Sequence, residues 1–425
     1  MINRLSIVTT AVLAASAGVQ AAEGFDVKFS GFGTVALTHS SDKRADYVGS
    51  RFQPNGAGLA GNPNFGPDTK LGGQVSAQLN DQWSAVVQVV SQHQYDNSYT
   101  PALEWANVKY QVTPEWSVRA GRVALPSYLI SESRFVGYAN TWAHVPTEVY
   151  SVLAITSNDG VDITHRKAFG DINNTFQAYY GNSKAKLPSD VVVKSQPAWG
   201  FNDSVEIGSL TLRAGYSNIL VDLTIPSIDG VFGGLSKLAA GTAAVPLASF
   251  QATSSQASAL SSKYKLKEMA LSAVSFGVTY DPGNWFVMSE FVAFRGDGLL
   301  ANSTSWYSTV GYRWGAFTPF LSYASTKAKI PTEAGITSVT GDPTTDGAAS
   351  ALTGAINTSL NAFNGSQNST SVGVRWDVMR NTAIKAQYDH VKLGSGSTGR
   401  FANALTTFPK GGSVDLLSLS LDFVF

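Results

Sequence analysis

Residues 413–425 read S-V-D-L-L-S-L-S-L-D-F-V-F and carry the clearest structural pattern of the chain. The apolar set is Leu417, Leu419, Leu421, Phe423 and Phe425, and the polar set between them is Ser418, Ser420 and Asp422. Successive side chains of a strand point to opposite faces, so this strand has one apolar and one polar face. Such a strand is typical of a transmembrane β-barrel, in which lipid-facing and lumen-facing side chains alternate.

The amino-terminal end has the pattern of a secretory signal. Arg4 precedes an apolar run from Leu5 to about Val19, and Val19-Gln20-Ala21 is an acceptable small-residue cleavage site. The run is too short and too weakly flanked for a membrane-spanning helix. We therefore expect residues 1–21 to be a signal peptide that is removed, and residues 22–425 to form one transmembrane β-barrel domain.

The composition narrows the class of protein. The 425 residues include no cysteine, and only 14% are charged, although the mean hydropathy is near zero at −0.01. A large barrel closed by backbone hydrogen bonds needs no disulfides, and strands that face lipid on one side and water on the other give this balance. No segment after the signal approaches about 18 uninterrupted apolar residues. The formal net charge of zero argues against nucleic acid as a partner.

Alternating segments of about ten residues recur along the chain, joined in turn by short turns and long loops. The short turns lie at Asn80-Asp81-Gln82, Thr113-Pro114-Glu115, Gly170-Asp171, Glu206-Ile207-Gly208, Asp281-Pro282-Gly283, Gly315-Ala316 and Asp377 to Asn381. The long loops lie at about 39–69, 94–102, 124–157, 181–197, 219–267, 296–303, 325–369 and 392–412. Seven turns and eight loops predict sixteen antiparallel strands in an all-β, up-and-down barrel, with both termini at the short-turn end.

Aromatic residues gather beside the predicted short turns: Trp83, Tyr110, Trp116, Tyr280, Trp285, Trp314, Phe317 and Trp376. Amphipathic rings favour the membrane–water boundary, so this set predicts one aromatic girdle. The alternative is that aromatic residues simply favour strands.

Two of the long loops are rich in small residues. Loop 219–267 is expected to hold a short helix around Leu235 to Leu260, followed by Lys263, Lys265 and Lys267. These lysines would either meet phosphates of the outer leaflet or be a solvated loop stem. Loop 325–369 is expected to be mobile.

The chain resembles the general porins of Gram-negative outer membranes over essentially all of its mature length. The resemblance rests on Phe29-Ser30-Gly31-Phe32-Gly33-Thr34, on Glu104-Trp105-Ala106-Asn107-Val108-Lys109-Tyr110 and on the carboxyl-terminal strand. It implies sixteen strands, a homotrimer, a third loop folded into the lumen, and a terminal Phe425 that serves as a signal to the barrel-assembly machinery. The chain lacks the Pro-Glu-Phe-Gly signature of the enteric third loop, and its fifth and seventh loops are long.

The candidate third loop follows Arg119-Ala120-Gly121-Arg122-Val123. Its candidate constriction residues are Tyr128, Glu132, Arg134, Trp142, His144 and Glu148. The loop is more apolar and aromatic than a free loop, which favours packing against the inner wall. Its aromatic residues would either offer a surface to an amphipathic solute or only anchor the loop.

The parity of the strands gives candidate residues of the inner wall. Basic residues on the polar parity are Lys28, Lys109, Arg119, Arg213, Arg313, Arg375 and Lys385, and acids are Asp26, Asp162, Glu290 and Asp389. Positive charge in a narrow lumen enriches anions, so a weak anion preference is expected. The alternative is that these bases are paired with acids or screened by water. Arg122 has the wrong parity for the lumen unless a bulge intervenes.

The sequence contains no signature of an enzyme. It lacks a phosphate-binding glycine loop, an H-E-x-x-H motif and a G-x-S-x-G elbow. The five histidines, His39, His93, His144, His165 and His390, show no metal-like spacing. No cofactor, metal or catalytic residue is therefore expected. A barrel hydrolase, and an adhesin or receptor acting through its long loops, are the alternatives from other classes.

The expected function is a water-filled channel in the outer membrane for passive diffusion of small hydrophilic solutes and ions. The alternative of the same architecture is a channel selective for a small organic acid or a similar solute. The expected surroundings are outer-membrane lipid and lipopolysaccharide.

Overall fold

The structure, a computed structural model, describes residues 26–151, 155–300 and 302–425. Within these residues, sixteen antiparallel strands close into one barrel, as predicted. They are β1 (Asp26–Ser40), β4 (Lys70–Gln78), β5 (Trp83–Gln92), β6 (Ala102–Gln111), β7 (Trp116–Ala124), β8 (Ser157–Phe169), β9 (Ile172–Asn182), β12 (Ala198–Ile207), β13 (Leu210–Thr224), β14 (Met269–Tyr280), β15 (Trp285–Gly296), β16 (Asn302–Tyr312), β17 (Phe317–Lys329), β18 (Gln367–Met379), β19 (Thr382–Leu393) and β20 (Ser413–Val424). The expected signal peptide lies outside the described residues.

The barrel closes where β20 pairs with β1. Two backbone hydrogen bonds join Gly31 and Phe425, with N–O distances of 2.9 and 3.0 Å. The ring of Phe425 covers Gly31, and the ring of Phe423 covers Gly33, where an added Cβ would lie only 2.3 Å from either ring. Glycine on β1 therefore makes room for the terminal aromatic rings. Because each of the sixteen barrel strands has two neighbours, the described part of the barrel wall leaves no backbone edge to be satisfied in lipid.

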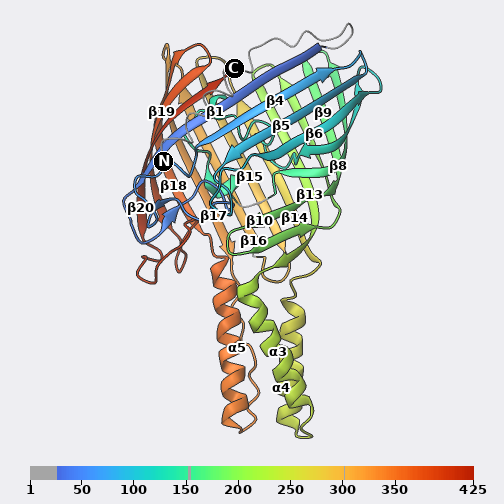
Figure 1. Ribbon diagram of the computed structural model, residues 1–425, viewed down its shortest axis with the longest axis vertical. Coiled ribbons are helices and arrows are strands. Elements are labelled where there is room, and N and C mark those ends of the chain that lie inside the picture. Colours follow the sequence, from blue (N-terminus) through green and yellow to red (C-terminus); the bar gives the residue numbers. More distant parts are fainter. Residues whose placement is uncertain (1–25, 152–154, 301) are drawn as a thin grey trace.

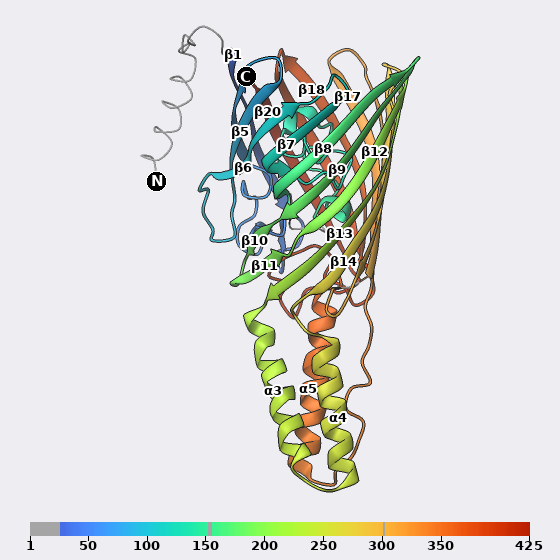
Figure 2. The same ribbon diagram turned by 90° about the vertical axis from the view of Figure 1, so that its right-hand side faces the viewer.

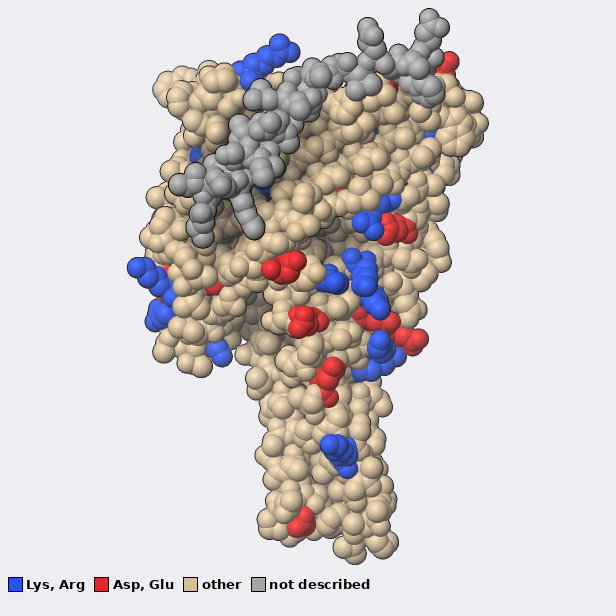
Figure 3. Space-filling view, in the orientation of Figure 1, with Lys and Arg blue, Asp and Glu red and all other residues tan. Residues whose placement is uncertain are grey.

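The outer face of the barrel is apolar and the inner face is polar, the reverse of a soluble protein. On β20, Leu417, Leu419 and Leu421 are 51%, 50% and 40% exposed, whereas Ser418, Ser420 and Asp422 are buried. In Figure 3 the visible wall of the barrel carries few charged side chains, and these gather towards the long-loop end. The alternation predicted from residues 413–425 thus places leucine outward and polar groups inward.

The aromatic residues beside the short turns lie together around the short-turn end of the barrel. Trp83, Trp116, Tyr280, Trp285, Trp314, Phe317 and Trp376 are all exposed. Neighbouring strands supply ring pairs: Trp83 lies 4.6 Å from Tyr110, Tyr280 lies 5.3 Å from Trp285, and Phe317 lies 5.7 Å from Trp376. Stacking across strands in one exposed band fits the predicted girdle better than a general strand preference.

The long connections gather at the opposite end of the barrel (Figure 1). The loop after β1 contains a small hairpin of β2 (Asp46–Tyr47) and β3 (Ala57–Gly58). The loop after β9 contains a second hairpin, β10 (Lys184–Leu187) and β11 (Val191–Ser195), and β11 also pairs with the extended end of β13. Residues 125–151 together with 155 and 156, called the inner segment below, include the turns η2 (Gly137–Ala139) and α2 (Thr147–Tyr150).

Three helices project from the long-loop end as a stalk: α3 (Pro226–Ala243), α4 (Ala248–Lys263) and α5 (Pro343–Ala362) (Figures 1 and 2). The sequence predicts one short helix in the first of these loops and a mobile second loop, whereas the structure has two long helices in the first and one in the second. The stalk has a buried core that the two loops build together, which includes Ile228, Leu235, Leu260 and Ile356. Each helix alone has too narrow an apolar stripe to be stable, so the helices form only by packing on each other. No described helix is long and apolar enough to cross a membrane.

Candidate functional site

The inner segment leaves the end of β7 and is attached to the polar face of the wall opposite. Its backbone N–H groups donate to wall side chains: Leu129 to Glu290 at 2.8 Å and Ala143 to Gln387 at 2.9 Å. Its carbonyl groups accept from wall cations, as Pro126 does from Arg213 at 2.7 Å. Hydrogen bonds from an irregular segment to side chains of the wall replace the backbone pairing that a strand would have supplied.

The aromatic residues of the inner segment are buried against the wall. Trp142 is 3% exposed and donates its indole N–H to Thr309 at 3.1 Å. Tyr150 donates its hydroxyl to Glu290 at 2.5 Å and contacts Tyr307. Tyr128 is also buried, in edge-to-face contact with Tyr150. Of the two interpretations left open by the sequence, anchoring of the segment is the one that this burial favours.

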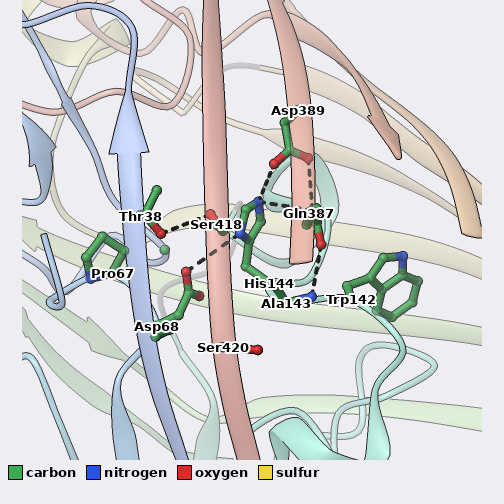
Figure 4. A network of polar contacts seen from close by, with 12 residues as sticks. Thr38, Pro67, Asp68, Trp142, Ala143, His144, Gln387, Asp389, Ser418 and Ser420 are labelled. Carbon is green, nitrogen blue, oxygen red and sulfur yellow. Dashed lines mark hydrogen bonds and ion pairs between the residues drawn. The ribbon is translucent and has the colours of Figure 1, made fainter. Parts of the chain in front are cut away.

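His144 lies at the centre of a polar cluster that joins three parts of the chain (Figure 4). Its Nε2 lies 3.1 Å from Asp389 of β19, and its Nδ1 lies 3.7 Å from Asp68 of the loop after β1. Burial alone would lower the pKa of His144, but the carboxylates of Asp389 and then Asp68 outweigh it and raise this pKa to about 9. The shorter contact makes Asp389 the principal partner. A charged imidazole therefore ties the inner segment to the wall and to the first loop.

Two further buried charged side chains, Glu148 and Lys385, hold the inner segment through hydrogen bonds. The carboxylate of Glu148 accepts from Gln367 at 2.6 Å and from Ser369. Lys385 of β19 pairs with Asp422 of β20 at 3.1 Å, with both side chains 0% exposed. The same ammonium donates to the carbonyl groups of Gly137 and Trp142, at 2.8 and 2.9 Å. Lys385, predicted for the lumen from its parity, is thus enclosed between the wall and the inner segment.

Several other predicted wall residues point inward, and most have acidic partners. Arg119 pairs with Asp162 at 2.7 Å and with Glu132 at 3.4 Å. Arg375 pairs with Asp377 at 2.7 Å and donates to the carbonyl of Tyr138 at 2.5 Å. Pairing with acids, which the sequence left open as the alternative, therefore applies to Arg119 and Arg375.

Three predicted cations have no ion pair among the described residues. Arg134 donates to the carbonyl of Tyr150 at 2.8 Å, and Arg213 donates to Pro126 and Ser204. Lys109 is half-buried on β6, in register with Arg119. Among the described residues, the buried acids Glu104, Glu148 and Glu290 likewise have no ion pair.

The remaining predicted cations lie away from the inner segment. Lys28 is exposed beside Asp26 at the short-turn end, with a 3.3 Å ion pair. Arg313 follows β16 in the short turn and pairs with Asp281 at 2.6 Å. Both therefore lie at the mouth of the barrel.

Arg122 faces the outer side of the barrel. It lies next to Gly121, whose φ of +123° breaks the regular strand geometry. Its guanidinium pairs with Asp159 at 2.6 Å, on the parity of β8 that also exposes Val161 and Ile163. The irregularity at Gly121 does not turn the side chain inward, so Arg122 is not part of the inner wall.

Strand parity does not apply to loops, yet some loop residues also line the inside of the barrel. Arg51 and Arg400 come from the first and last long loops and meet in one cavity.

Of the loop lysines, Lys263 pairs with Glu333 at 2.5 Å and Lys265 lies 4.0 Å from Glu268. Within the described part of the chain, no group of three or more His, Cys, Asp or Glu has the geometry of a metal site.

No family model and no curated protein matches the sequence, but solved structures match the fold. The anion-selective porin from Comamonas acidovorans has a TM-score of 0.54 at 12% identity, covering 94% of this chain and 100% of that chain. OmpF of Salmonella typhi in complex with daunomycin has a TM-score of 0.53 at 12% identity, covering 95% and 98%. The in-vitro folded outer-membrane protein OmpT of Vibrio cholerae, in its trimer form, has a TM-score of 0.50 at 10% identity, covering 95% and 100%. This chain therefore has the fold of Gram-negative outer-membrane porins, as its sequence predicted.

Proposed function

We propose that the protein is an outer-membrane channel through which small hydrophilic solutes and ions diffuse passively, with a weak preference for anions. The observation that carries the proposal is the closed barrel with leucine on its outer face and Ser, Thr, Gln and charged groups on its inner face. Such a barrel is stable in lipid and encloses a polar passage. The inner segment narrows that passage, because it is attached to the wall by Trp142, His144 and Glu148.

The charge of the passage supports the anion preference. Arg134, Arg213 and Lys109 have no acidic partner within ion-pair distance among the described residues. Arg119 keeps part of its side chain towards the solvent while paired, with 24% of it exposed. Unpaired cations in a narrow, water-filled space enrich anions and repel cations.

The assembly and its surroundings follow from the same proposal. A homotrimer is supported by the trimer form of the structural neighbour from Vibrio cholerae. The exposed apolar wall would contact lipid and the neighbouring subunits, and lipopolysaccharide would surround the outer rim. Secretion through the signal peptide at residues 1–21 and recognition of Phe425 by the assembly machinery complete the proposal. The proposed function is transport without catalysis, because the charged groups of the inner segment serve as anchors.

Single-channel recording of the refolded protein in a planar bilayer tests the function. We expect stepwise openings, in threes for a trimer, and a reversal potential in a KCl gradient that shows chloride more permeant than potassium. A clear cation preference would contradict the charge assignment while leaving the channel intact. Failure to open at any voltage would contradict the channel itself and favour an adhesin or an enzyme.

A further inference from the structure

A cavity of about 470 Å³ lies at the long-loop end of the barrel, above the inner segment. Six long loops contribute to it, together with residues of the inner segment. Its walls are largely apolar and include Val193, Leu223, Phe294, Phe363 and Phe401. The volume falls in the range of sites for small organic ligands, about 300–1,000 Å³. We call it the vestibule cavity.

The charged residues in the lining of the vestibule cavity are two arginines. Arg51 uses its Nε to bond the carbonyl of Ser151 at 3.0 Å. Arg400 donates one terminal nitrogen to Thr326 at 3.1 Å, and its Nε is buried without a hydrogen-bond partner. Among the described residues, neither guanidinium has a carboxylate within 4.0 Å. Both guanidinium groups therefore keep N–H donors that are not bonded to the described residues.

Arg400 is held in place by its neighbours and not by an acid. Its backbone N–H donates to Gln367 at 2.7 Å, and Gln367 in turn donates to Glu148 at 2.6 Å. Its guanidinium lies against Gly365, where a Cβ would be 3.0 Å away. The side chain is thus oriented in advance towards the cavity, which lowers the entropy cost of binding.

The local electrostatics favour an anion. Burial lowers the pKa of Arg400, and the positive charge of Arg51 lowers it further, whereas Glu148 opposes both. Arg51 and Glu148 both act on Arg400, but neither arginine has a described carboxylate within ion-pair distance, so positive charge is in excess at the cavity. A single bound negative charge would balance the group and occupy the unused donors.

We propose that the vestibule cavity binds an organic monoanion with an apolar body, an aryl or medium-chain carboxylate, with Arg51 and Arg400 holding its carboxylate. This rests on the proposed channel function and names the class of solute that the channel concentrates at its outer mouth. The apolar walls distinguish this class from inorganic anions, which would leave Leu223, Phe294 and Phe401 facing water. The guanidinium groups distinguish it from neutral apolar solutes, which would leave the unused donors of both arginines without a partner.

The probe is 2-naphthoate, tested on the full-length refolded protein by calorimetry in detergent and by bilayer recording. Its controls are acetate, which has the charge without the apolar body, and 2-naphthalenemethanol, which has the body without the charge. We expect 2-naphthoate to bind one site per barrel and to interrupt the current from the long-loop side. Both controls should bind at least tenfold more weakly. Equal binding of the neutral analogue, or equal binding of acetate, would overturn the proposal.

Variants locate the site. Arg400→Gln and Arg51→Gln should each weaken the binding of 2-naphthoate at least tenfold. Lys410→Gln removes an equal charge from the exposed part of the same loop as Arg400 and should leave this binding unchanged. If Arg400→Gln fails to fold, Arg51→Gln decides, because Arg51 is exposed to the cavity and makes one hydrogen bond. An equal loss in all three variants would refute the site. A barrel that conducts KCl but ignores 2-naphthoate would refute only this inference, whereas a barrel that never opens would refute the proposed function.

Discussion

The inner segment and the helical stalk are both long connections of one barrel, yet they are stabilised in opposite ways. The inner segment has little regular structure and is held by charged and polar groups of the wall, including Glu290, Gln387 and Lys385. The stalk is regular, and small and aliphatic residues such as Ile228, Leu235 and Ile356 form its core. A segment inside a barrel can bond to the polar face that surrounds it. A segment outside must satisfy its own backbone, and α3, α4 and α5 do so as helices.

The largest effect is expected from breaking the buried pair beneath the inner segment. Lys385→Met leaves Asp422 without its cation and releases the carbonyl groups of Gly137 and Trp142. We expect a loss of about 3–5 kcal/mol in unfolding free energy, measured by urea titration of intrinsic fluorescence in detergent. Conductance should also become noisier, because the inner segment is loosened.

The exposed Lys392 on the same strand provides the control for this change. Lys392→Met should alter stability by less than about 0.5 kcal/mol. The double variant Lys385→Met with Asp422→Leu should lose less than Lys385→Met alone, since no unpaired charge remains. A double variant that is as unstable as the single one would show that the ion pair is not the source of the effect.

Most of the barrel could be predicted from the sequence, because each strand carries its own pattern. The alternation of Leu417, Leu419 and Leu421 assigns faces without knowledge of any partner strand, and the turns at Gly170 and Asp281 are local signals. The predicted turns and long loops lie between the observed strands, with boundaries shifted by a few residues. Periodicity fails only where a segment does not alternate.

The stalk and the charge pairing could not be predicted in the same way. The core of the stalk joins α3 to α5, more than 90 residues apart, and Gly234 lies so close to Leu352 that a Cβ would be 2.7 Å away. Such packing produces only a weak pattern of apolar residues in the sequence of each loop. Parity assigns Arg119 and Lys385 to the inner face but not their partners Asp162 and Asp422, which come from adjacent strands whose register depends on the closed barrel. Arg51 and Arg400 lie in loops, to which parity does not apply.

A second effect, of intermediate size, comes from the titration of His144. Its pKa is raised to about 9 in the folded protein, compared with 6.5 ordinarily. The stabilisation is therefore complete below pH 6.5 and is lost as the pH rises through about 9. We expect a loss of up to about 3 kcal/mol between pH 6.5 and pH 10, followed in urea titrations. His144→Gln should be less stable at pH 6.5 and should flatten this dependence, and an identical slope in the two proteins would contradict the role of His144.

The smallest effect on the barrel is expected from removing the whole stalk. Replacing residues 227–262 and 332–361 with short Gly-Ser linkers retains the strands, the inner segment and the ion pairs that anchor it. Unfolding free energy should change by about 1 kcal/mol or less, because longer or shorter outer loops cost little. Single-channel conductance should also stay close to that of the full chain.

Removing α5 alone is the informative contrast. It uncovers the face of α3 on which α5 packs, around Gly234 and the buried Leu235. We expect aggregation or proteolysis of the remaining pair of helices, monitored by size-exclusion chromatography and limited proteolysis, while the barrel still resists unfolding. If removal of the whole stalk destabilised the barrel as much as Lys385→Met does, the two regions would not be independent. If removal of α5 left α3 and α4 protected, the shared core would not be what stabilises them.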